Sequence, residues 1–194
     1  MAVLTVEGLG KTFAVARVGK AVRAFEDVGF EIHPGLALGV VGSGARTVLQ
    51  CVRGTIAPDE GTILYQSQRR GLVDLLAIGL AEAARIRDEE WCAVSRFDMG
   101  GMRRKRRREG TSDAEWLRGA LAIALDLRPR MLLLDAMDCS AEDLRDTETV
   151  WLASELKGRG TAILGAFSSA IAACALCDGA LLLPDSDGRR TSAA

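Results

Sequence analysis

The residues GLALGVVGSGARTVL, Gly35–Leu49, decide the fold of this chain of 194 residues. A short apolar run ends in glycines at positions 39, 42 and 44, and a helix-like segment begins near Arg46. A strand, a glycine loop and a helix in this order are typical of a phosphate-binding loop. Its backbone N–H groups turn inward, and the helix N-terminus adds partial positive charge. The stretch therefore predicts a cradle for phosphate.

The two side chains that such a loop normally carries are absent. The G-x-x-x-x-G spacing is intact from Gly39 to Gly44, but Ala45 and Arg46 replace the Lys and the Ser or Thr that should follow. Arg46 lies one residue after the Lys position, so its side chain leaves the helix about 100° away from it. Because arginine binds phosphate well, Arg46 is interpreted either as a weak phosphate ligand or as a surface arginine.

Length and composition indicate one α/β domain. The chain is long enough to bury a real core, and 48% of its residues are hydrophobic. Apolar strands that alternate with helices in the second half predict a parallel sheet covered on both faces. Val22–Ile32 alternates with period two, which predicts antiparallel strands in the first half. We expect a single domain over residues 1–184 and a flexible tail over 185–194.

Local patterns give further predictions. Gly8–Lys11 is expected to be a turn between two extended segments. A helix is expected over Thr47–Arg53, and a single long helix over Ala141–Lys157.

The charged residues are unevenly distributed. The net charge is −1, yet the run Arg103–Arg108 holds six of the 25 basic residues. This run lies in residues 97–110, which have no apolar periodicity and are expected to be a solvated loop. It could bind nucleic acid, anionic lipid or an acidic protein face. Since no aromatic residues are interleaved for base stacking, we do not expect nucleic acid and keep docking to a protein open.

The cysteines and the hydropathy favour a cytoplasmic location. The five cysteines lie scattered in apolar settings, which is typical of a reducing compartment rather than of a disulfide framework. Cys174 and Cys177 have the spacing of redox or metal motifs, but there is no second pair and only one histidine, His33. We therefore expect buried structural thiols. No apolar run reaches transmembrane length, so we expect no membrane span.

Seven segments occur in the order and spacing of the motifs of one family. They are KTF at Lys11–Phe13, GVVGSGART at Gly39–Thr47, PDEGTI at Pro58–Ile63, AVSRF at Ala93–Phe97, TSDAEWLRGALAIAL at Thr111–Leu125, RPRMLLLDAMD at Arg128–Asp138 and GTAILGAFS at Gly160–Ser168. From about Val3 to Pro184 the chain thus resembles an ATP-binding cassette (ABC) ATPase. It is most similar to the small ABC subunits of the phosphonate carbon–phosphorus lyase system.

The resemblance implies a P-loop NTPase-like ABC core, with a parallel sheet flanked by helices and antiparallel strands at the N-terminus. It also implies ATP and Mg²⁺ as ligands. Phe13 would stack on adenine, and Asp135 would hold Mg²⁺. The resemblance places the phosphates against Gly39, Gly42, Ser43, Gly44, Arg46 and Thr47.

The departures from the family pattern argue against hydrolysis. Ala45 replaces the Walker A Lys, Ala136 the general-base Glu and Ser168 the switch His. The remaining departures are Arg96 for the Q-loop Gln, Asp113 and Ala114 for the signature glycines, and Glu142 at the D-loop Asp. Losing cation, base and switch together leaves no route to phosphoryl transfer, so we expect no catalytic residue and doubt that ATP and Mg²⁺ bind.

The family's helical subdomain is also largely deleted, since residues 97–110 are too short to form it. Because that subdomain carries the contacts with membrane partners, we do not expect coupling to a transporter.

Three functions remain open at this point. The first and favoured one is a pseudo-ATPase that serves as a scaffold or accessory subunit of a cytoplasmic protein complex. The second is an unorthodox ATP sensor or weak ATPase that uses Arg46, Arg96 and Asp135. The third is binding of nucleic acid or an anionic surface through Arg103–Arg108. The sequence fixes neither the partner nor the oligomeric state.

Overall fold

The computed structural model describes residues 1–15, 20–65, 75–78 and 113–184. The predicted basic loop over 97–110, the Q-loop segment over 93–97 and the tail over 185–194 lie outside these residues, as does the start of the signature segment.

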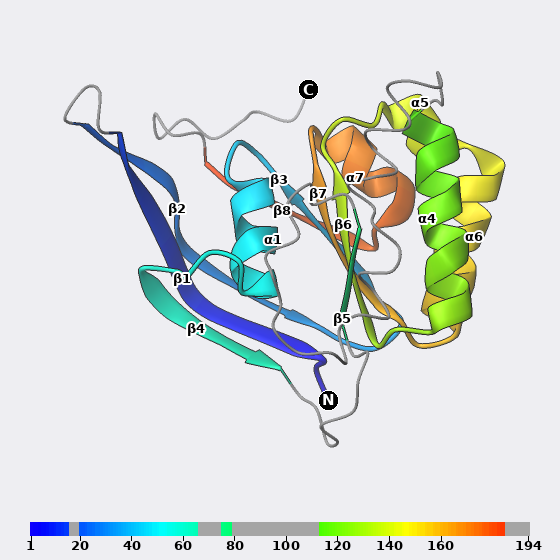
Figure 1. Ribbon diagram of the computed structural model, residues 1–194, viewed down its shortest axis with the longest axis horizontal. Helices are drawn as coiled ribbons and strands as arrows, with labels where there is room; N and C mark the ends of the chain where they lie inside the picture. Colours follow the sequence, from blue (N-terminus) through cyan, green and yellow to red (C-terminus); the bar gives the residue numbers. More distant parts are fainter. Residues whose placement is uncertain (16–19, 66–74, 79–112, 185–194) are drawn as a thin grey trace.

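The described strands form two sheets (Figure 1). The antiparallel sheet has the order β2-β1-β4, with bounds Lys20–Ile32, Leu4–Val15 and Glu60–Tyr65. The second sheet has the order β5-β6-β7-β3-β8, and all of its strand pairs are parallel. Its bounds are Leu75–Ile78, Met131–Ala136, Ala162–Phe167, Ala37–Val41 and Gly179–Leu182. The predicted division into an antiparallel and a parallel part is confirmed.

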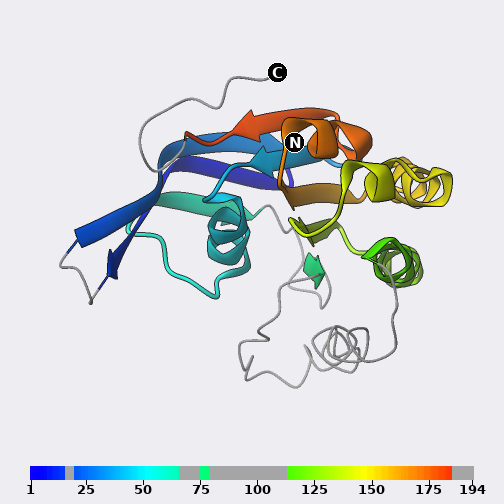
Figure 2. The same ribbon diagram turned by 90° about the horizontal axis from the view of Figure 1, so that it is seen from above.

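Helices cover both faces of the parallel sheet (Figures 1 and 2). α1 (Ala45–Arg53) packs on one face, together with the antiparallel sheet. The other face carries α4 (Asp113–Leu127), α5 (Ala141–Arg145), α6 (Thr147–Gly158) and α7 (Ala170–Leu176). In the described part of the chain, no helix is long and apolar enough to cross a lipid bilayer.

The two faces of the sheet explain why its central strands are apolar throughout. In β6, Leu132 and Leu134 pack toward α4 and α6, whereas Met131 and Leu133 pack toward α1 and the antiparallel sheet. Every residue of β6 and of β7 is buried. A strand buried on both faces has no solvated side, so its sequence does not alternate.

Two local predictions were wrong. Residues 8–11 are not a turn, because β1 continues through them with register shifts between Val6 and Leu9 and between Leu9 and Lys11. Gly8, with a φ of 58°, provides the irregularity. The expected helix over 141–157 is interrupted at Asp146. This residue is the N-cap of α6, and its carboxylate accepts a hydrogen bond from the N–H of Thr149. In addition, α1 begins at Ala45 rather than at Thr47.

Two glycines in the left-handed region allow a test of how tightly β1 and β4 are packed. A Cβ at Gly61 (φ 87°) would lie 2.5 Å from the carbonyl oxygen of Glu7, whereas one at Gly54 (φ 80°) would meet nothing within 4 Å.

We predict that Gly54→Ala lowers the free energy of unfolding by about 1 kcal/mol, from backbone strain alone. Gly61→Ala should lower the free energy of unfolding by roughly 3 kcal/mol, since β1 and β4 must also move apart. Urea denaturation measures both losses, and equal losses would contradict this packing.

Candidate functional site

The glycine loop joins β3 to α1 at the carboxyl-terminal edge of the parallel sheet, the edge at which open α/β sheets bind ligands. Gly39 lies within β3, Ser43 is exposed, and Thr47 is partly buried in the first turn of α1. Gly42 has a φ of 123°, and Gly44 precedes α1 without a side-chain cap. Strand, loop and helix therefore follow one another as the sequence predicted.

The loop retains backbone donors. The N–H of Ala45 donates to the carbonyl oxygen of Gly42 at 3.1 Å, and that of Val48 to Gly44 at 3.0 Å. The N–H groups just beside them make no hydrogen bond to any other described residue; they belong to Ser43, Gly44, Arg46 and Thr47. Backbone donors at a helix N-terminus that have no partner in the described part of the chain favour an anion.

The glycines of the loop also have a purely structural role. A Cβ on Gly44 would overlap the carbonyl oxygen of Ala24 in β2, and one on Gly39 would lie 2.7 Å from the Cβ of Ala173. These positions therefore require glycine because the backbone packs closely against β2 and α7. The glycine pattern alone is not evidence that phosphate binds.

Arg46 forms an ion pair with Asp135 at the end of β6. Its Nε donates to Oδ2 at 2.6 Å and its Nη2 to Oδ1 at 3.0 Å, so the pair is bidentate. The Asp135 side chain is 1% exposed and that of Arg46 is 40% exposed. The hydrogen bond with Asp135 raises the pKa of Arg46 above its ordinary value. Arg46 thus has a partner, Asp135, that its position in the sequence did not predict.

A second carboxylate adds negative charge to this site. Asp138 lies 3.4 Å from Nη2 of Arg46, through its Oδ2. The two positions at which the family has a Lys and a Glu carry Ala45 and Ala136, both fully buried. One guanidinium therefore faces two carboxylates, and this balance disfavours a phosphate in the loop.

Mg²⁺ does not fit the residues present. Mg²⁺ requires near-octahedral oxygen ligands, and the P-loop supplies one from a Ser or Thr hydroxyl. Here the guanidinium of Arg46 stands at that position and engages both oxygens of Asp135. Within the residues that the structure describes, no group of three or more His, Cys, Asp or Glu side chains could hold a metal ion.

Phe13, the predicted adenine contact, lies on a different element from Arg46 and Asp135. Phe13 lies opposite Val22 in the antiparallel sheet and is 37% exposed. The ammonium of Lys11 lies 5.6 Å from the centre of its ring and also binds Asp59 at 2.8 Å. Ser168 is exposed after β7, where the family has its switch His.

Sequence reasoning missed Asp138 as a participant. No motif gives Asp138 a role. The one signal in the sequence is its position three residues after Asp135, just beyond the end of the same strand. The reasoning also missed Arg118, which donates to Asp146 at 3.0 Å and lies 3.4 Å from Glu148, joining α4 to α6.

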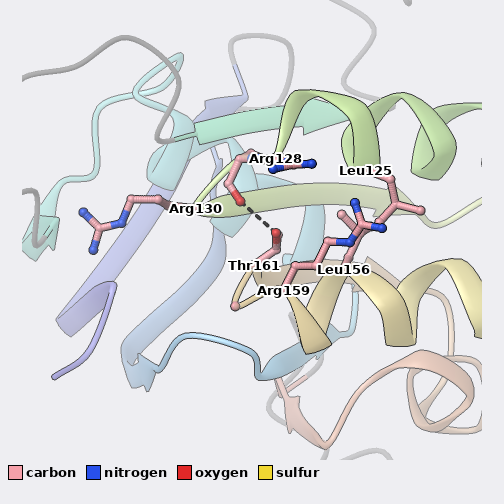
Figure 3. Close-up of a pocket in the computed structure, with 8 residues that line it drawn as sticks. Leu125, Arg128, Arg130, Leu156, Arg159 and Thr161 are labelled. Atoms are coloured by element: carbon pink, nitrogen blue, oxygen red, sulfur yellow. Dashed lines mark hydrogen bonds between the residues drawn. The ribbon is translucent and has the colours of Figure 1, made fainter.

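A hollow of about 480 Å³ lies at the opposite edge of the sheet from the glycine loop, where β6 and β7 begin (Figure 3). Arg128 and Arg159 follow the last residues of α4 and α6, where a cation interacts favourably with the helix dipole. Arg159 also pairs with Glu155 at 3.0 Å, and the buried hydroxyl of Thr161 donates to the carbonyl of Pro129. Helix termini thus account for these two arginines.

Comparisons with known proteins support the ABC resemblance. No protein-family model matches the chain. Over 86 residues, the chain is 33% identical to the phosphonates utilization ATP-binding protein PhnK of Escherichia coli, a match that covers 43% of this chain and 32% of that protein. Over 73 residues, it is 34% identical to the phosphonates import ATP-binding protein PhnC of Bdellovibrio bacteriovorus, covering 36% and 26%. The matched segments thus span a third or less of these relatives.

Solved structures match almost the whole chain. The bacterial ABC transporter cassette MJ0796 superposes with a TM-score of 0.62 at 16% identity, covering 97% of this chain and 96% of that one. The ATP-binding cassette MJ1267 gives 0.64 at 14% identity, covering 99% and 90%. The chain therefore has the fold of an ABC cassette, and part of its sequence is similar to phosphonate ATP-binding proteins. The predicted fold class and resemblance are confirmed.

The cysteines differ from the sequence-based expectation at one position. Cys51 and Cys139 are buried, Cys177 is partly buried and Cys174 is exposed, whereas Cys92 lies outside the described residues. Burial raises the pKa of Cys177 to about 12 and that of Cys51 to about 11. The expectation of buried thiols was wrong for Cys174.

We predict that iodoacetamide at mildly alkaline pH modifies Cys174 before Cys51 and Cys177. A raised pKa leaves little thiolate at this pH, so Cys51 and Cys177 should react at least about tenfold more slowly. Peptide mass spectrometry over a time course measures each rate, with the urea-unfolded chain as the control in which the three rates become similar. Rapid labelling of Cys177 in the folded chain would contradict the burial described above.

Proposed function

We propose that this chain is an ABC-type cassette that does not hydrolyse ATP and that serves as a scaffold or accessory subunit of a cytoplasmic protein complex. The observation that carries the proposal is the bidentate pair between Arg46 and Asp135. It places a guanidinium where phosphoryl transfer needs a metal ion and its hydroxyl ligand.

Several missing groups add to this argument. Ala45 removes the cation that stabilises the transferred phosphoryl group, and Ala136 removes the general base. Removing one such group typically costs orders of magnitude in rate. Since these losses act on one reaction step, residual hydrolysis should be negligible.

A scaffold role needs a fold that is complete without ligand and a surface that a partner can contact. Both faces of the parallel sheet are packed, and the Arg46–Asp135 pair links α1 to β6. Trp151 on α6 is 58% exposed and Ile171 on α7 is 51% exposed. Exposed tryptophan is enriched at protein interfaces, so this helical side is our proposed contact surface.

The partner and the pathway also belong to the proposal. The relatives are named for phosphonate utilization and for phosphonate import, and we propose a protein partner from such a system. That the chain does not couple to a transporter rests only on the sequence of residues 97–110, which lie outside the described residues. We also propose, from the sequence pattern, that residues 1–184 form a single cassette-like domain.

One observation favours the second candidate, a nucleotide sensor without hydrolysis. The N–H groups of Ser43, Gly44, Arg46 and Thr47 have no hydrogen-bond partner among the described residues, so an anion could accept from them. In this case the exposed part of the Arg46 guanidinium would contact phosphate while keeping Asp135 as its partner.

Titration calorimetry with ATP and ADP, with and without Mg²⁺, separates these functions. We predict no binding heat at millimolar nucleotide and no phosphate release above the buffer rate, because the guanidinium of Arg46 already engages the carboxylates of Asp135 and Asp138. Micromolar binding that Arg46→Ala abolishes would instead support the sensor. Phosphate release that saturates with ATP and disappears in Asp135→Asn would overturn the proposal of a non-hydrolysing cassette.

The scaffold role has its own test in the native host. We predict that a tagged chain co-purifies with a stoichiometric partner and that Trp151→Ser weakens this association at least about tenfold, as truncating an interface hot spot does. Val22→Ser on β2 is the matched control, since Val22 is also exposed but lies on the antiparallel sheet. Monomeric chain at all concentrations in the host extract, with no cross-linked partner, would contradict the role.

A further inference from the structure

The ion pair at the loop lies where two distant segments of the chain meet. Arg46 is in the first turn of α1, and Asp135 is near the end of β6, 89 residues later. Nε and Nη2 of Arg46 engage both oxygens of the carboxylate, and Nη2 also reaches Asp138. A guanidinium held by three carboxylate oxygens is a fixed cation rather than a mobile surface charge.

In P-loop ATPases, Mg²⁺ bridges the loop and the β6 aspartate. The loop hydroxyl after the Lys and the aspartate at the strand end both serve the metal. Arg46 occupies the position of that hydroxyl, and Asp135 that of the aspartate. The geometry points to Arg46 as a built-in cation that takes the place of Mg²⁺, an inference that deepens and rests on the proposed non-hydrolysing function.

Burial explains why Asp135 needs a permanent cation. Its side chain is 1% exposed, and an unpaired carboxylate at such a depth is strongly unfavourable. The N–H of Met137 provides one further bond, at 3.3 Å to Oδ1. A neutral N–H does not balance a charge, so the guanidinium of Arg46 provides the compensation.

A covalently attached cation has a different consequence from a bound ion. Mg²⁺ arrives and leaves, whereas Arg46 is present in every molecule. The loop is therefore tied to the end of β6 in the absence of any ligand, and both oxygens of the buried Asp135 carboxylate are already engaged when divalent metal is added. This arrangement predicts a cassette whose stability does not depend on Mg²⁺.

Thermal unfolding without nucleotide tests the inference. The samples are the full chain and Arg46→Ser, each in EDTA and in millimolar MgCl₂. The serine restores a hydroxyl beside Asp135 and Asp138 and leaves the buried carboxylate unpaired. We expect the melting temperature of the unchanged protein to be the same in both buffers. Arg46→Ser should unfold more readily in EDTA, with an unfolding equilibrium constant raised roughly tenfold or more, and Mg²⁺ should restore much of the loss.

Two variants control for other effects. Arg145→Ser removes an exposed arginine from α5. Its melting temperature should equal that of the unchanged protein, both in EDTA and in MgCl₂. In the double variant Arg46→Ser with Asp135→Asn, the carboxylate is gone, so rescue by Mg²⁺ should disappear. Rescue that persists in this double variant would show that the metal binds elsewhere and would overturn the inference.

Two further outcomes decide the matter. If Mg²⁺ stabilises the unchanged protein and Asp135→Asn removes that stabilisation, the metal site is intact and the inference is wrong. If Arg46→Ser does not fold, Arg46→Lys decides, since it keeps one positive charge. A stability of Arg46→Lys that is independent of Mg²⁺ supports the inference, and one that rises with Mg²⁺ through Asp135 overturns it. No nucleotide is present, so a failure here is distinct from observed ATP hydrolysis.

Discussion

The bidentate pair between Arg46 and Asp135 is the interaction on which the candidate site depends. It joins the start of α1 to the end of β6 and neutralises a carboxylate that is almost completely buried. Because the guanidinium uses the fork geometry that matches a carboxylate, the bond has a defined direction as well as a charge. Every interpretation of the loop has to begin with this cation, which belongs to the chain.

The chain has the fold of an ABC cassette, but the side chains at its glycine loop differ from those that the family's chemistry uses. The sheet order β5-β6-β7-β3-β8, the two packed faces and the glycine loop are all present. Solved ABC cassettes match this arrangement over nearly the whole chain at 14–16% identity. Such a likeness establishes the fold, whereas activity depends on particular side chains, and several of these differ here.

The glycines show how a motif can persist for structural reasons. Gly39 and Gly44 leave no room for a Cβ, because α7 and β2 pack against them. Their spacing would therefore be required even if no phosphate ever entered the loop. A sequence pattern that serves both packing and binding cannot distinguish the two roles, and the residues between and after the glycines carry that information.

The sequence by itself determined the class of fold and the place of the loop. Glycine spacing after an apolar strand and the apolar runs of β6 and β7 reflect preferences of neighbouring residues, and these are readable along the chain. The break at Asp146 and the continuity of β1 through Gly8 were missed, because capping and strand pairing overrode the local pattern. Only the tertiary structure decided which group Arg46 pairs with. Its partner Asp135 lies 89 residues away in the sequence. The two residues meet because β6, β7 and β3 are neighbouring parallel strands, so the end of β6 lies at the same sheet edge as the start of α1.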